Sequence, residues 1–176
     1  MGLDVFFYKC KRSDYNAYNK AIEEWQNEKP QSGKISHEDY EKLSEDEQKK
    51  IQQEVSKWYK KQPNTDKYGI SEIGYFRKVN FLMAFFNYEG NCEFKEIAKS
   101  ELEDLVERCN AILTTTKKKD RQEKAEDLLP TQSGFFYGST EYDKYYYDDV
   151  KEVRDWASGV LNDLKDEEIV LMYCWW

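Results

Sequence analysis

Histidine, proline and glycine are scarce in this chain of 176 residues, which has one histidine, three prolines and eight glycines. So little proline and glycine excludes collagen-like and linker-like compositions. The sequence also lacks an apolar run of the roughly 18 residues that a membrane-spanning helix needs. Its first residues lack the basic and apolar segments of a secretory signal. We therefore expect a cytoplasmic protein that does not bind a membrane.

The four cysteines, Cys10, Cys92, Cys109 and Cys174, form no C-x-x-C pair, and His37 lies in a polar stretch. Zinc sites need closely spaced Cys and His pairs, so we expect neither a metal ion nor a cofactor. A Cys–His or Ser-His-Asp arrangement would have to recruit the single histidine from a helix surface, and we do not expect one. Any acid–base chemistry would fall to carboxylates, lysines or tyrosines.

Charge and aromatic rings are abundant instead. Charged residues make up 35% of the chain and aromatic residues 16%, which argues against disorder because disordered chains have few aromatic residues. The net charge is −8, and residues 130–176 hold most of the excess, with four basic and ten acidic side chains. An acidic surface repels phosphate backbones, so we expect no direct nucleic-acid binding. The excess is either a solvated face or a surface that competes for a basic groove of another protein.

Hydrophobic periodicity predicts an α+β fold, a mainly helical single domain over residues 1–176 with a small sheet of short strands. Residues 3–10 and 167–176 are short, apolar and aromatic, as strands are, and residues 90–99 have room for a third. Because the two terminal strands flank an otherwise helical chain, we expect them to pair centrally in the sheet.

The predicted helices begin at polar residues that can cap a helix N-terminus. A serine or threonine followed three residues later by an acidic residue is the pattern of a capping box. The expected helices, with the pairs that mark their starts, are 13–27, 36–61 (Ser36, or Ser44 with Glu47), 101–114 (Ser100 with Glu103), 120–129 and 141–164 (Thr140 with Asp143).

Residues 70–88, ISEIGYFRKVNFLMAFFNY, differ from the rest because apolar side chains cover most of their helical projection. This pattern predicts a helix buried in the middle of the domain, with Gly74 marking close packing. Arg77 and Asn80 lie three residues apart and would share one side of that helix. Polar groups there need partners. They form either a clamp that holds a loop or helix end, or a contact to an anion or carboxylate in a cleft.

Residues 130–143 are the least ordinary segment, because two glycines bracket an aromatic triplet, Phe135-Phe136-Tyr137. Glycine permits close backbone approach or a positive φ, and the start of the following helix favours an anion. The segment is therefore either a capped turn that packs its rings into the core or a ligand pocket with aromatic walls. It contains no phosphate-loop motif. The candidate ligand-binding residues here are Gln132, Ser133, Tyr137, Ser139 and Tyr142.

Asp143, Asp148 and Asp149 lie beside a run of tyrosines at the start of the last predicted helix, and they are candidates for a partner surface. Paired carboxylates can hold a hard cation or act in acid–base catalysis. Adjacent residues of a helix point about 100° apart, however, so Asp148 and Asp149 are badly placed to share a metal ion. An exposed acidic face is the expected arrangement.

The chain resembles a group of small, uncharacterised bacteriophage and prophage-type proteins in three stretches: MGLDVFFYK, GYFRKVNFLMAFF and LLPTQSGFFYGSTEYDKYYYDDV. The resemblance spans most of the chain in order, apart from the loops and residues 30–67. In that group the middle stretch often has a histidine and a tryptophan where this sequence has Met83 and Phe85. The resemblance therefore implies no catalytic histidine here. A phage-type setting implies interaction with a host protein or a counter-defence role.

We therefore predict a non-enzymatic binding protein that acts on a host protein or a small anionic ligand, at a site where residues 70–88 meet residues 130–143. One alternative is an acidic inhibitor that mimics nucleic acid and occupies a basic groove of a host protein. The other is an enzyme that acts on an anionic substrate with carboxylate or tyrosine groups. A cleft that holds Arg77 beside a carboxylate of perturbed pKa would favour the enzyme.

Overall fold

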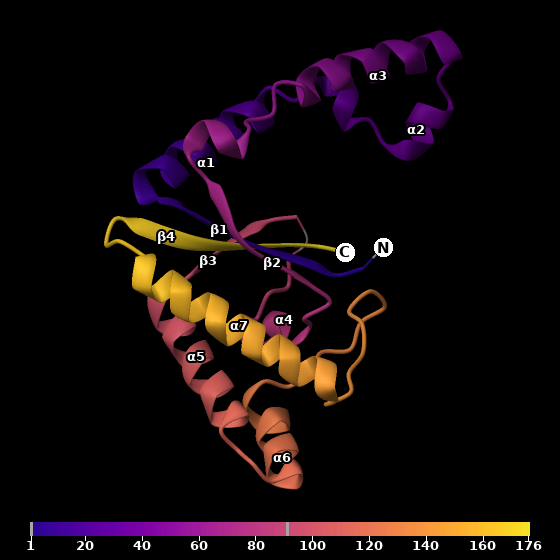
Figure 1. Cartoon of the computed structure of the whole chain (residues 1–176). Helices are drawn as coiled ribbons and strands as arrows, with labels where there is room; N and C mark the ends of the chain where they lie inside the picture. The colour runs from indigo at the N-terminus through magenta and orange to yellow at the C-terminus, as the bar shows by residue number, and fades with distance from the viewer. Residues whose placement is uncertain (1, 91) are drawn as a thin grey trace. The chain divides into compact units, whose positions relative to one another are not determined.

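The computed structural model describes residues 2–90 and 92–176, and Figure 1 shows their elements in chain order. These residues divide into two compact units. One unit consists of the N-terminal strand together with Ser71–Trp176, and the other is the insertion Arg12–Ile70 between the first two strands. The mainly helical α+β fold expected from the sequence is confirmed, whereas the single-domain assignment stays a prediction.

The strands of the first unit are β1 (Asp4–Lys11), β2 (Ser71–Arg77), β3 (Phe94–Ile97) and β4 (Glu168–Trp175). They form one antiparallel sheet in the spatial order β2-β1-β4-β3. β1 and β4 pair along their whole length, from Asp4 opposite Trp175 to Lys11 opposite Glu168. The two terminal strands therefore lie at the centre of the sheet, as the sequence predicted.

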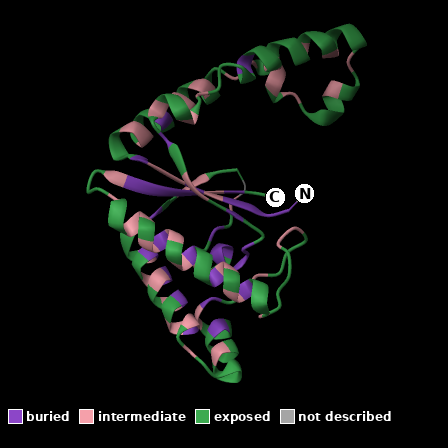
Figure 2. Ribbon diagram, viewed as in Figure 1, coloured by how far each residue is buried: buried purple, intermediate pink, exposed green. Residues whose placement is uncertain are grey.

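The helices of the same unit are α4 (Phe81–Phe85), α5 (Lys99–Leu113), α6 (Lys118–Leu128) and α7 (Lys144–Asp163). α5 and α7 pack side by side on one face of the sheet (Figure 1). α5 and α7 each have a buried stripe, drawn purple in Figure 2, and an exposed face. No helix in the described part of the chain is both long and apolar enough to cross a membrane.

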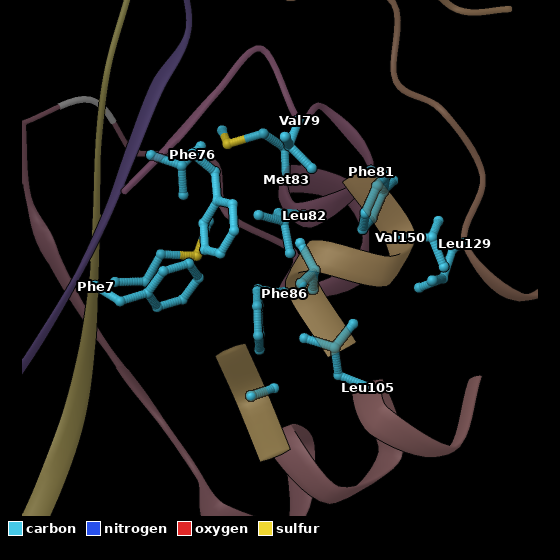
Figure 3. Close-up of a cluster of buried hydrophobic side chains, with 14 of the residues drawn as sticks. Phe7, Phe76, Val79, Phe81, Leu82, Met83, Phe86, Leu105, Leu129 and Val150 are labelled. Atoms are coloured by element: carbon cyan, nitrogen blue, oxygen red, sulfur yellow. The ribbon is translucent and has the colours of Figure 1, made fainter. Parts of the chain in front are cut away.

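The hydrophobic core lies between the sheet and these helices, because side chains alternate between the two faces of a strand. Phe7 of β1 is fully buried, and its ring centroid lies 6.0 Å from that of Phe76 and 5.8 Å from that of Phe86. Figure 3 shows these rings together with Leu82 of α4 and Leu105 of α5. The core therefore joins the sheet, the short α4 and the α5–α7 pair.

The inserted unit contains α1 (Arg12–Asn27), α2 (His37–Glu41), α3 (Glu45–Tyr59) and two short 3-10 helices, Gln31–Lys34 and Thr65–Tyr68. Two tryptophans hold it together. The rings of Trp25 and Trp58 stack with centroids 4.1 Å apart and planes at 2°. Each indole N–H donates a hydrogen bond to the carbonyl of the other residue, at 2.9 and 2.7 Å. This reciprocal contact joins the end of α1 to the end of α3.

Residues 70–88 do not form the single buried helix that their apolar pattern predicted. β2 ends at Arg77, Lys78 has a left-handed φ of 62°, and α4 then covers only Phe81–Phe85. The helix prediction was wrong because a segment that is apolar on all sides suits a buried strand and turn as well as a buried helix. The burial of this segment in the core was predicted correctly for α4, because most of α4 is buried.

Gly74 lies in β2 at the point where the indole of Trp156, from α7, covers the strand. The indole N–H donates to the carbonyl of Ile73 at 2.8 Å. A Cβ added at Gly74 would lie 2.4 Å from the indole nitrogen, closer than real side chains approach. Glycine at this position therefore permits the packing of α7 over β2, and the expected close packing at Gly74 is observed.

The predicted helix starts are only partly correct. The capping box at Ser44 and Glu47 is present, but residues 36–61 form two helices, α2 and α3, rather than one. α5 begins at Lys99, before the predicted pair Ser100 and Glu103, and the backbone N–H of Ala98 donates to the Glu101 carboxylate at 2.7 Å. The expected start of α7 at Thr140 was also wrong, because Asp143 itself caps that helix with hydrogen bonds from the N–H groups of Tyr145 and Tyr146.

Candidate functional site

The segment that follows α6 is held in place by the side chain of Asn80, which is only 3% exposed. Its Nδ2 donates to the carbonyl of Tyr137 at 3.3 Å and to that of Ser139 at 2.8 Å. Its Oδ1 accepts a hydrogen bond from the backbone N–H of Gln132 at 3.2 Å. Both amide hydrogens are therefore engaged with the loop, as in the clamp that the sequence offered as one alternative. We call residues 131–139 the anchored loop.

Further contacts fix the same segment. The backbone N–H of Leu3 donates to the carbonyl of Phe136 at 2.8 Å, and the N–H of Lys78 donates to the carbonyl of Leu3 at 2.8 Å. The hydroxyl of Thr131 donates to the carbonyl of Thr140 at 3.1 Å and so joins the two ends of the loop. The N-terminal residues, the β2–α4 connection and the anchored loop are therefore one hydrogen-bonded assembly.

Gly138 has a φ of 92°, which side-chain-bearing residues rarely adopt. A Cβ there would lie 3.1 Å from the Cβ of Lys78, whose own φ is 62°. The loop and the β2–α4 connection therefore approach each other closely through two left-handed residues. The positive φ expected at a glycine of this segment is observed at Gly138.

The aromatic triplet of the loop does not act as one unit. Tyr137 packs against the core, and its ring centroid lies 5.7 Å from that of Trp176. Phe136 is partly buried, whereas Phe135 is 95% exposed. Phe135 is thus neither packed into the core nor part of a pocket wall, and both expectations fail for this residue. The structure instead shows a large apolar side chain in water on an anchored backbone.

A hollow of about 250 Å³ lies beside the loop, between the β2–α4 connection and the start of α7. It brings together five of the predicted site residues, whereas Gln132, Ser133, Tyr137, Tyr142 and Asp148 do not line it. The pockets that bind drug-sized ligands measure about 300–1,000 Å³, so this hollow has room only for a small group. The predicted residues that do line it are Arg77, Asn80, Ser139, Asp143 and Asp149.

The hollow has charges of both signs. Arg77 lies 3.9 Å from the Asp4 carboxylate, which also accepts a hydrogen bond from the Tyr75 hydroxyl at 2.6 Å. Burial, and to a smaller extent the nearby carboxylates, together raise the pKa of Asp149 to about 6. A guanidinium group and a carboxylate of perturbed pKa therefore line the same hollow.

A second and larger depression lies where the start of α6 meets the start of α7, with a volume of about 730 Å³. Tyr142, Asp143 and Asp148 line it, together with four basic residues outside the predicted site. The basic residues are Lys118 and Arg121 on α6 and Lys144 and Lys151 on α7. Their spacing is a signal in the sequence, because helix residues three apart, such as the α6 pair, or seven apart, such as the α7 pair, share one face.

No protein-family model, curated protein or solved structure matches this chain.

Proposed function

We propose that the protein is a non-enzymatic binding protein and that the anchored loop is its docking element, with Phe135 as the side chain that enters a partner. The observation that carries the proposal is the combination of a 95% exposed phenylalanine with a backbone held by Asn80 and Leu3. Folding does not use the ring of Phe135 for burial, so its apolar surface is available to another molecule.

Anchoring matters for affinity as well as for position. Ordering a flexible loop on binding costs conformational entropy, and a loop that is already fixed avoids most of that cost. Large aromatic side chains dominate the energetics of many interfaces when they enter an apolar pocket of the partner. The anchored loop combines both conditions, because its hydrogen bonds precede binding and Phe135 points its ring into solvent.

The occupant that suits this loop is a protein with an apolar pocket. The adjacent hollow is too small for a drug-sized ligand, and Phe135 does not line it. The resemblance to phage-type proteins favours a protein of the bacterial host as the partner.

The test is affinity capture from host lysate by three immobilised proteins: wild type, Phe135→Ala and Tyr59→Ala. Tyr59 is the matched control because it is an exposed ring, at 55%, in the inserted unit. We expect wild type and Tyr59→Ala to retain the same partner at low and high salt, and Phe135→Ala to lose it. A partner that Phe135→Ala retains as well as wild type would contradict the proposal.

Two further variants test the contribution of the other predicted site residues. Gln132 contacts Asn80 through its backbone N–H and not through its side chain, so Gln132→Ala keeps this hydrogen bond. Arg77→Ala removes the ion pair with Asp4, which is 3.9 Å long and involves a half-exposed arginine. Such a pair contributes about 0–1 kcal/mol to stability. Both variants should fold normally and bind the partner more weakly. Loss of several kcal/mol of stability in both would show that these residues serve the fold instead.

An acidic inhibitor is the second candidate function, and the electrostatics of α7 favour it. Besides burial, the neighbours that raise the pKa of Asp149 are Glu152, Asp148 and Asp143, so these carboxylates repel one another. Such a surface suits a basic groove. Its binding would weaken steeply between low and high salt, whereas binding through Phe135 would not, so the two salt conditions of the capture experiment separate the two functions.

An enzyme is the third candidate, because Arg77 and Asp149 line one hollow and the pKa of Asp149 is raised to about 6. A carboxylate with a pKa close to the working pH suits general acid–base catalysis. A small anionic substrate would then be turned over by wild type and by Phe135→Ala, and not by Asp149→Asn. Turnover that persists in Asp149→Asn would remove this candidate.

A further inference from the structure

Arg121 lines the basic depression between α6 and α7. Its Nε is buried and has no hydrogen-bond partner. Its guanidinium carbon lies 3.8 Å from the ring centroid of Tyr147, so the group stacks on that ring. Within the described residues, the guanidinium forms no hydrogen bond or ion pair. Most buried polar atoms have a partner, so the unpaired Nε of Arg121 is an exception within the described residues.

The other basic residues of the depression are also uncommitted. Lys118, Lys144 and Lys151 form no ion pair with any described residue. By contrast, Lys117 and Lys119, which flank Lys118 in the sequence, pair with acidic residues of α6 at 4.0 and 3.7 Å. None of the four basic residues that line the depression has an acidic partner among the described residues, although the protein as a whole is strongly acidic.

Three carboxylates share the depression, and one of them is already engaged. Asp143 accepts the N–H groups of Tyr145 and Tyr146 as the cap of α7 but keeps its charge, so with Glu141 and Asp148 it sets three carboxylates against four cations. The uncharged lining residues are Leu113, Tyr142 and Tyr147, with the polar Thr116 and Gln122. A volume of about 730 Å³ lies within the range of small-molecule pockets and is far larger than a single inorganic anion needs.

We propose that this depression binds a small aromatic phosphate monoester, with the phosphate on the guanidinium edge of Arg121 and the aromatic ring against the tyrosine-lined wall. An arginine fork presents two parallel N–H groups to a phosphate, and stacking on Tyr147 fixes the plane in which that fork points. The four cations of the lining outnumber its three carboxylates, so the lining favours an anionic group. The site is separate from the anchored loop and does not depend on the function proposed for it.

The test uses phenyl phosphate as the probe, with inorganic phosphate and benzoate as comparison ligands. Isothermal calorimetry gives the affinities, and ¹⁵N-resolved NMR follows the side-chain Nε–H signal of Arg121, which a bound phosphate should shift. The variants are Arg121→Lys, which keeps the charge and loses the fork, and Lys151→Gln. Arg154→Lys is the control, because Arg154 is paired with Asp155 and does not line the depression.

We expect phenyl phosphate to bind more tightly than either comparison ligand and to shift the Arg121 Nε–H signal. Arg121→Lys should weaken its binding by about tenfold or more, Lys151→Gln by a few-fold, and Arg154→Lys not at all. Thermal unfolding of each variant establishes that it is folded. The proposal is overturned if the Arg121 signal does not respond, if folded Arg121→Lys binds like wild type, or if inorganic phosphate binds as tightly as phenyl phosphate.

Discussion

Replacing Asn80 by alanine tests the anchoring of the loop. The substitution removes hydrogen bonds to two carbonyls, of Tyr137 and Ser139, and to the N–H of Gln132, from a residue that is 3% exposed. A typical hydrogen bond contributes about 0.5–1.5 kcal/mol net, and buried groups left without a partner cost more. We expect Asn80→Ala to lower the free energy of unfolding by about 2–4 kcal/mol.

Urea unfolding at pH 7 and 25 °C measures this change, and a second asparagine provides the control. Asn110 is exposed on α5 and donates no side-chain hydrogen bond in the described structure, so Asn110→Ala should change stability by less than about 0.5 kcal/mol. Limited proteolysis should cut residues 131–139 faster in Asn80→Ala than in wild type. If Asn80→Ala is no less stable than Asn110→Ala, the side chain does not anchor the loop and the reasoning fails.

Three other predictions concern packing, pH and thiol reactivity. Gly74→Ala should lower the thermal midpoint strongly because its Cβ would overlap an indole ring, whereas Gly159→Ala, with nothing within 4 Å, should raise it slightly by improving helix propensity. The raised pKa of Asp149, about 6, means that the folded state binds the proton more tightly than the unfolded state, so this group's contribution to stability falls as the pH rises from about 4 to 6. Asp149→Asn should therefore stabilise the protein at pH 7 and have little effect at pH 4, as measured by urea unfolding, and an equal effect at both pH values would contradict the shift. A thiol reagent at pH 8 should modify the exposed Cys92 quickly and leave buried Cys109 unmodified, because burial raises the pKa of the Cys109 thiol to about 12; mass mapping distinguishes the two.

Three of the four described strands and most helices could be predicted because their signals are local. The terminal strands, α1 and α6 follow short-range patterns of apolar spacing and polar breaks, and their positions agree within a few residues. The helix predicted over residues 70–88 was wrong for the opposite reason. A run that is buried on every side has no periodicity to distinguish a strand and turn from a helix, and the left-handed φ of Lys78 that separates β2 from α4 has no glycine to mark it.

The candidate site could be predicted only at the level of its segments. The sequence identified residues 70–88 and 130–143 as partners, and Asn80 does join them. Its three hydrogen bonds reach 52 to 59 residues along the chain, however, and no local pattern specifies such distances. The same limit applies to the basic depression, where Arg121 and Lys151 come together only because α6 and α7 fold beside each other. The exposure of Phe135 was not predicted, since an aromatic triplet between glycines suggested burial or a pocket wall.

The most direct test of the docking role of the anchored loop is a calorimetric titration of the captured, purified partner with wild type and with Phe135→Ala. Truncation of an aromatic anchor at the centre of an interface costs about 2 kcal/mol or more, which corresponds to roughly thirtyfold in affinity. We predict a loss of at least that size for Phe135→Ala, with wild-type affinity for Tyr59→Ala. Equal affinity of wild type and Phe135→Ala would contradict the account.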